Sequence, residues 1–111
     1  MNQLTKQSSD SEIKRYFTAV LKLAKSSEQF PVNLDKVWML AYNRRDYAVD
    51  ALKKDFIENV DYVCTSVKTE VGSNKYEYHI SVSCLEFFIA RKVRPVFEVY
   101  RKVFHKTTSF Q

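Results

Sequence analysis

The stretch that decides the fold is residues 60–82, VDYVCTSVKTEVGSNKYEYHISV, where the apolar pattern takes a period of two. Alternate positions form one face in each half of it: Tyr62, Cys64 and Ser66 first, then Tyr76, Tyr78, Ile80 and Val82. Between the halves, Gly72-Ser73-Asn74 supplies residues that favour a turn. The stretch therefore predicts a β-hairpin.

Three helices are predicted before this hairpin. Ser9 and Glu12 have the spacing of a capping box, and the apolar residues after them predict a helix over about 11–27. Pro31 favours an extended segment at 30–33, after which Asn33 can cap a short helix. The inward face of that helix would hold Leu34, Val37, Trp38 and Ala41, with Trp38 substantially buried. The third helix would be capped by Asp46 and turn these residues inward: Ala48, Ala51, Leu52 and Phe56.

Two helices are predicted after the hairpin. Ser83 and Glu86 have a second capping-box spacing, and Pro95 should end this helix and begin the last one. The last helix would line one face with Val96, Val99, Tyr100 and Val103. The expected fold is a single small α+β domain in the order ααα-ββ-αα, with the helices packed on the β-hairpin.

The amino-acid composition excludes several classes of function. With 111 residues, of which 45% are hydrophobic, the chain can bury one core. Its single Gly leaves no Gly-rich phosphate loop, and Cys64 and Cys84 are expected to be reduced core residues. With His79 and His105 they lack the spacing of a metal site, so neither metal nor cofactor is expected. No apolar run suits a signal peptide or a membrane span, and a cytoplasmic location is expected.

Positive charge is concentrated at the end of the chain. The formal net charge is +5, yet residues 55–90 carry two Lys or Arg against six Asp or Glu, whereas residues 91–111 carry six against one. Such a cluster would attract a polyanion, and nucleic acid is the obvious candidate. The same cations also suit the solvated face of an amphipathic helix, and the pattern leaves both interpretations open.

The second and third helices resemble a helix-turn-helix, since only about four residues would join them. Helical hairpins with basic turns that bind nothing show the same pattern. If DNA is the ligand, the candidate contacts around the third helix are Arg44, Arg45, Tyr47, Lys53 and Lys54. A second surface that contacts the DNA backbone would hold Arg91, Lys92, Arg94, Arg101 and Lys102.

Four segments resemble the amino-terminal domain of phage antirepressors of the AntA/AntB type. They are Val32-Asn33 at a helix start, Phe56 to Tyr62 leading into a strand, Tyr78-His79-Ile80-Ser81 before the next helix, and the basic, aromatic segment Arg94 to Phe104. The aromatic position that the family has after the turn is not clearly matched in residues 47–52. The resemblance divides the chain into a polar tail (1–10), a helix outside the match (11–30), an antirepressor-like domain (31–106) and a polar tail (107–111).

The resemblance implies a transcriptional regulatory module from a phage or prophage and no chemistry. Its partner would be double-stranded DNA, or alternatively a repressor protein that the module grips without touching DNA. An enzyme is not expected, because no carboxylate is spaced to a His or Cys in a catalytic pattern. The oligomeric state stays open, a homodimer included.

Overall fold

The computed structural model describes residues 3–105 and confirms the small α+β domain. Its helices and strands follow in the order α1 (Asp10–Lys25), β1 (Val32–Asn33), η1 (Leu34–Lys36), η2 (Trp38–Leu40), α2 (Arg45–Asp55), β2 (Tyr62–Lys68), β3 (Asn74–Ile80), α3 (Val82–Phe88), η3 (Ala90–Lys92) and α4 (Arg94–Phe104). The elements marked η are single turns of 3₁₀ helix. Lys106 and the tail predicted at 107–111 lie outside the described residues.

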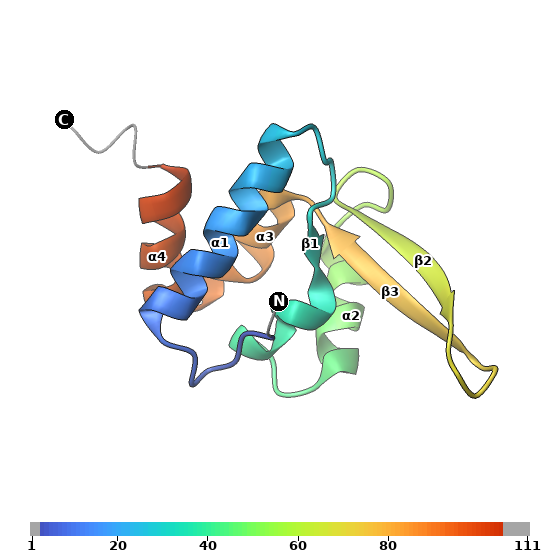
Figure 1. Ribbon diagram of the computed structural model, residues 1–111. Coiled ribbons are helices and arrows are strands. Elements are labelled where there is room, and N and C mark those ends of the chain that lie inside the picture. Colours follow the sequence, from blue (N-terminus) through green and yellow to red (C-terminus); the bar gives the residue numbers. More distant parts are fainter. Residues whose placement is uncertain (1–2, 106–111) are drawn as a thin grey trace.

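The predicted hairpin is present, and a third strand joins it. β2 and β3 pair antiparallel, and β1 pairs with the far side of β3 through Val32 with Ile80 and Asn33 with His79. The extended segment before Asn33 was predicted, whereas its place in the sheet was not. The outer part of the hairpin projects from the body of the domain (Figure 1).

The helices α1, α3 and α4 form the other half of the domain, and α1 packs along α4 (Figure 1). Phe17 of α1 is fully buried there, with its ring centroid 5.9 Å from that of Tyr100 and 6.2 Å from that of Phe104. The residues predicted to line the inward face of α4 are all buried: Val96, Val99, Tyr100 and Val103.

Three of the predicted caps can be checked at the starts of the α-helices. The box at Ser9 is confirmed, since its hydroxyl accepts from the Glu12 N–H at 3.1 Å and its own N–H donates to the Glu12 carboxylate at 2.8 Å. The box predicted at Ser83 is wrong, because Ser81 caps α3 by accepting from the Cys84 N–H at 3.1 Å. Asp46 is not a cap either; it lies in the first turn of α2, and its carboxylate pairs with Arg44.

The second predicted helix is replaced by two 3₁₀ turns. Asn33 does cap the first turn, accepting from the Asp35 N–H at 2.9 Å. At Val37, however, φ is −129°, outside helical geometry, and η2 starts afresh from there. Trp38 is consequently only half-buried at the edge of the core, although Leu34 and Val37 are fully buried as predicted.

Within residues 3–105, every helix is too short or too polar to span a membrane.

Candidate nucleic-acid interface

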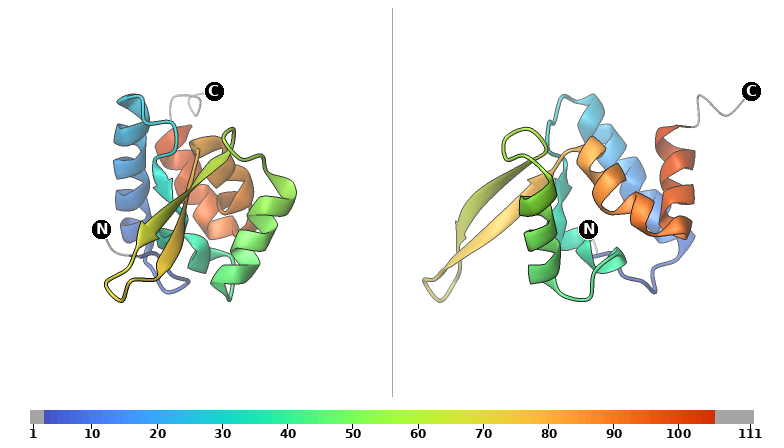
Figure 2. Two further views of the ribbon diagram at one scale, coloured as in Figure 1. Left: turned by 90° about the vertical axis from the view of Figure 1, so that its right-hand side faces the viewer. Right: turned by 180° about the vertical axis from the view of Figure 1, so that it is seen from behind.

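The helix α2 lies beside the hairpin, which extends past it (Figure 2). Between them is an open hollow of about 370 Å³, lined by Lys53 and Glu58 together with Tyr62, Cys64, Tyr76 and Tyr78 of the hairpin. The Lys53 ammonium lies 5.7 Å from the centre of the Tyr78 ring, and its hydrogen bond to Tyr78 raises the pKa of Lys53. One face of the hairpin thus offers tyrosine rings to this hollow, with a cation above them.

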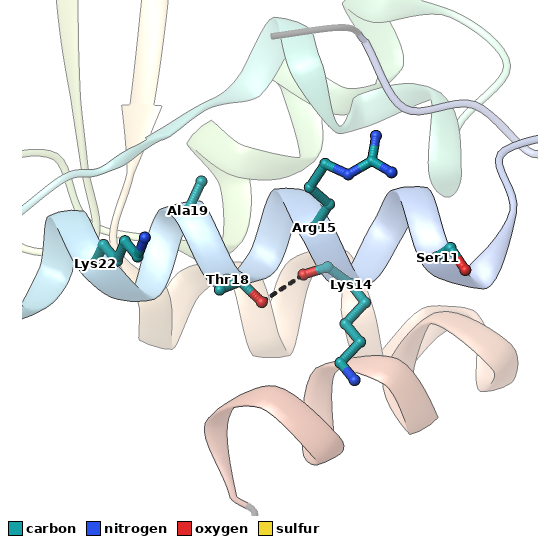
Figure 3. Close-up of a pocket in the computed structure, with 6 residues that line it drawn as sticks. All are labelled: Ser11, Lys14, Arg15, Thr18, Ala19 and Lys22. Carbon is teal, nitrogen blue, oxygen red and sulfur yellow. Dashed lines mark hydrogen bonds between the residues drawn. The ribbon is translucent and has the colours of Figure 1, made fainter.

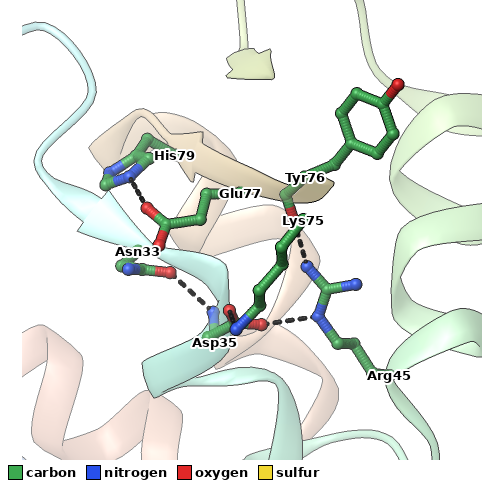
Figure 4. Close-up of polar contacts among 7 residues, drawn as sticks. All are labelled: Asn33, Asp35, Arg45, Lys75, Tyr76, Glu77 and His79. Carbon is green, nitrogen blue, oxygen red and sulfur yellow. Dashed lines mark hydrogen bonds and ion pairs between the residues drawn. The ribbon is translucent and has the colours of Figure 1, made fainter. Parts of the chain in front are cut away.

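Arg45, a predicted DNA contact, is half-buried and binds two other elements of the domain. Its guanidinium donates to the Asp35 carboxylate at 2.6 Å and to the Tyr76 carbonyl at 2.7 Å, so it ties α2 to η1 and β3 (Figure 4). Lys75 contacts the same carboxylate at 3.3 Å. Burial alone would raise the pKa of Asp35, but the hydrogen bond and charge of Arg45, together with Lys75, lower it. Arg45 therefore sets the position of α2 against the hairpin.

The turn before α2 gathers cations from three parts of the chain. Lys6 donates to the Asn43 side chain at 3.0 Å, and the Lys92 ammonium lies 4.8 Å from the centre of the Tyr42 ring. Arg44 follows directly in the chain. Sequence reasoning placed Lys6 in a polar tail and missed it, because the contacts that bring that tail to the turn are between distant segments: the Leu4 N–H donates to the Lys36 carbonyl, and the Leu4 side chain is buried in the core.

Arg44 forms an exposed unit with the first turn of α2. Its guanidinium makes two hydrogen bonds of 3.0 Å to the Asp46 carboxylate and lies 5.0 Å from the centre of the Tyr47 ring. The Tyr47 side chain is 52% exposed, and Asp50 and Lys54 are exposed at helical spacing after it. These residues form the outer face of α2. The helix itself is neutral, because three cations balance three carboxylates: Arg45, Lys53 and Lys54 against Asp46, Asp50 and Asp55.

The second predicted surface lies apart from this face. The C-terminal half of α4, with Arg101 and Lys102, is on the side of the domain away from α2 and the hairpin (Figure 2). Arg94 and Arg101 both pair with Glu98, at 3.1 and 3.3 Å. The structure therefore does not unite the ten predicted residues, and of the second group only Lys92 reaches the turn before α2.

Arg91 is the centre of a separate aromatic surface. Its guanidinium lies 5.0 Å from the ring centre of Phe87 and 5.8 Å from that of Phe97. The Phe87 side chain is 56% exposed, although phenylalanine is normally buried.

The outer face of α1 is a further basic surface. A shallow hollow of about 460 Å³ is lined there by Ser11, Lys14, Arg15, Thr18, Ala19 and Lys22 (Figure 3). The Lys14 side chain extends toward α4 in this view. Because apolar and charged residues recur along α1 at helical spacing, the helix has one packed and one solvated face, and this surface is the solvated one.

Residues 3–105 hold no cluster of three or more His, Cys, Asp and Glu that could bind a metal ion. Cys84 is a buried free thiol, and burial raises its pKa to about 12, whereas Cys64 is a half-buried free thiol in the hollow. Comparison of the chain with models of protein families, with curated proteins and with solved structures finds no match. What the face formed by α2 and the hairpin binds is therefore inferred from its own geometry.

Proposed function

We propose that this domain is a transcriptional regulator of the phage antirepressor type that binds double-stranded DNA through α2, the turn before it and the adjoining hairpin. The observation that carries the proposal is the convergence of Lys6, Arg44 and Lys92 on the turn that leads into an exposed helix. An α-helix fits the DNA major groove, and cations beside its start are placed to meet the phosphates that flank the groove.

Affinity and specificity would come from different residues. Because α2 is neutral, the cations beside its two ends, Lys54 among them, would supply the attraction to phosphate, and the first two turns of its outer face would read the bases. The unit of Arg44 and Tyr47 lies at the first turn, where a helix-turn-helix protein contacts base edges. Asp50, one turn further, can accept a hydrogen bond from the amino group of cytosine. Arg45 is assigned to the support of α2 rather than to DNA.

Two exposed lysines provide a matched test of which surface of the domain contacts DNA. Lys54 lies at the end of α2 and Lys102 at the end of α4, and neither has an ion-pair partner among the described residues. In duplex titrations at several salt concentrations, Lys54→Ala should reduce the slope of log affinity against log salt by about one, since one phosphate contact is lost. Lys102→Ala should leave the slope unchanged. Equal effects of the two variants would contradict the assignment to α2, and a wild type without salt-sensitive binding to any duplex would refute DNA binding.

The base-reading residues should behave differently from the lysines. Tyr47→Ala removes the ring on which Arg44 rests, and should relax the preference at one base pair by about 1 to 3 kcal/mol while leaving the salt slope nearly unchanged. The measurement is the affinity for single-base variants of a duplex selected by the wild type. A uniform loss over all variants would make Tyr47 a contact to the backbone instead.

The aromatic surface around Arg91 supports a second candidate function, a grip on a repressor protein. An exposed Phe beside an Arg is the kind of anchor that dominates protein interfaces. Such binding would change little with salt, would be lost in Phe87→Ala, and would persist in Lys54→Ala. If binding to a purified repressor survived Phe87→Ala, this surface would not be the grip.

A further inference from the structure

β2 is an outer strand of the sheet and has an open edge. The Asp61 carbonyl accepts from Ser81 at 2.9 Å and so faces β3, whereas the Tyr62 carbonyl accepts from Asn59 at 2.6 Å and faces the other way. Backbone groups alternate along a strand, so the N–H and C=O groups of Cys64 and Ser66 point outward as well. Within residues 3–105 no backbone group pairs with this side of β2 between Val63 and Val67.

Along residues 62–67 this edge lacks the usual protection against pairing, and the one charged residue of β2 is Lys68 at its end. Exposed edge strands normally carry charges, Pro or bulges, yet residues 62–67 contain no charged residue and no Pro, and their pairing with β3 runs without a bulge. The structure has eight exposed large apolar side chains among its described residues, and four lie on β2 or directly beside its ends: Ile57, Val60, Val67 and Val71. An exposed apolar edge of this kind favours another strand over water.

We propose that β2 pairs antiparallel with β2 of a second copy of this chain, with the two-fold axis at Thr65. In that register Thr65 faces Thr65 of the second copy, and Val63 faces Val67. Cys64 and Ser66 of the two copies then face each other through their outward N–H and C=O groups, which exchange hydrogen bonds. The axis must pass through a residue rather than between two, because only then do the outward residues of both copies meet, and Thr65 is the midpoint of the stretch from Val63 to Val67 whose outward side is unpaired among the described residues.

The ends of the hairpin are complementary in this arrangement. The two-fold axis brings the hairpin turn of one copy, with Val71 at 88% exposure, alongside the 57–60 segment of the other, where Ile57 and Val60 are 63% and 60% exposed. Glu58, which lies beside Tyr62 on the open edge, would meet Lys68 of the second copy. Both partners in each contact are exposed in the single chain, so pairing covers apolar surface and joins opposite charges.

Pairing also places two copies of α2 on one side of a continuous six-stranded sheet. Antiparallel pairing across an edge has its two-fold axis perpendicular to the sheet, and α2 covers the face that bears Tyr78. Two copies of α2 on one side of the sheet would suit a DNA site with two-fold symmetry, if α2 binds DNA as proposed. The dimer itself does not depend on DNA binding, and its tests use no DNA.

Cysteine cross-linking tests the register in the full chain. With Cys64→Ser as background, Thr65→Cys places two thiols across the axis at a Cα separation of about 4.5 Å, within the range that a disulfide spans. Val67→Cys, which is also exposed and lies on the same face of β2, is the control, because its two copies would be about 13 Å apart. With oxidised glutathione as the electron acceptor, Thr65→Cys should give a covalent dimer and Val67→Cys should not. Equal or no cross-linking of both variants would overturn the register.

Charge swapping tests the pairing without covalent chemistry. Thr65 is exposed in the single chain, so Thr65→Lys and Thr65→Glu should fold, as circular dichroism would verify. In sedimentation analysis each variant alone should be a monomer at concentrations where the wild type is a dimer, because like charges would lie directly opposite each other at the axis. An equimolar mixture of the two variants should form a heterodimer. A monomeric wild type at every concentration, or a mixture that stays monomeric, would overturn the proposal.

Discussion

Replacing Arg45 tests whether this residue stabilises the fold around the candidate interface or contacts DNA directly. From its position in the sequence, Arg45 was predicted to contact DNA. In the structure its guanidinium, at the start of α2, bridges Asp35 of η1 and the Tyr76 carbonyl of β3. We therefore expect Arg45→Ala to lower the free energy of unfolding, with loss of DNA binding only as a secondary effect. Arg44→Ala is the matched control, since its ion pair with Asp46 is exposed at 63% and 56%.

The magnitude follows from partial burial. The Arg45 and Asp35 side chains are 35% and 22% exposed, so their ion pair is partly buried. Exposed ion pairs are worth about 0.2 to 1 kcal/mol, and disrupting a buried pair costs about 3 to 5 kcal/mol. We place their coupling at about 1 to 2 kcal/mol, because Lys75 still neutralises Asp35 after the substitution. The bond to the Tyr76 carbonyl adds about 1 kcal/mol. Arg45→Ala should thus cost about 2 to 3 kcal/mol, and Arg44→Ala less than about 1 kcal/mol.

Urea unfolding of Asp35→Ala, Arg45→Ala and the double variant gives the coupling directly. The pH dependence gives a second check. Because Arg45 lowers the pKa of Asp35 from its ordinary value of 3.8, this contribution is present above pH 3.8 and is lost as the pH falls through the lowered pKa. The difference between wild type and Arg45→Ala should therefore shrink in strong acid. Equal stability of Arg45→Ala and wild type, with DNA affinity lost, would make Arg45 a DNA contact and refute its structural role.

Three further predictions concern the core. Trp38→Ala should cost about 1 to 3 kcal/mol in urea unfolding, less than the 3 to 5 of a fully buried Trp, because Trp38 is half-buried; a loss above that range would mean that it is integral to the core. Cys64 should react with a thiol reagent at neutral pH well before Cys84, whose pKa is raised to about 12, and equal rates would contradict the burial of Cys84. Burial raises the pKa of Tyr16 to about 12 and that of Tyr100 further, so stability should be full below pH 10 and fall above it; in a spectrophotometric titration, both tyrosines ionising near pH 10 in folded protein would refute this.

Periodicity predicted the parts of the fold that rest on local pattern. The hairpin and the inward face of α4 follow from repeats of two and of about 3.6 residues, and Pro95 fixes the start of α4 because it suits a first helical turn. The box at Ser9 held because both of its partners lie in one short segment. At Ser83 the same spacing failed, since Ser81 lies two residues earlier, directly after β3, and caps α3 there.

Contacts between distant segments could not be predicted in this way. The pairing of β1 with β3 joins residues nearly fifty positions apart, and a two-residue strand carries no periodicity of its own. For the same reason Lys6 was missed at the turn, and Arg45 was named as a candidate DNA contact although its guanidinium is bound by Asp35 and the Tyr76 carbonyl. The net charge of residues 91–111 did not show where the cations lie, because Arg94 and Arg101 both pair with Glu98 and the C-terminal half of α4 is away from α2 (Figure 2).

If α2 binds DNA as proposed, the placement of charge along it suits selectivity between bases more than strength of binding. A helix meant only to hold phosphate would gain from an excess of cations, yet α2 carries as many carboxylates as cations, and Asp46 restrains Arg44 in a bidentate pair beside Tyr47. Such restraint lowers the entropy lost on binding and fixes the direction of the donors, both of which favour discrimination between bases. Weak attraction by one copy is then offset if two copies bind together through β2, because the second contact becomes intramolecular. The monomeric charge variants of Thr65 should accordingly lose far more affinity for a two-fold symmetric duplex than for a single half-site.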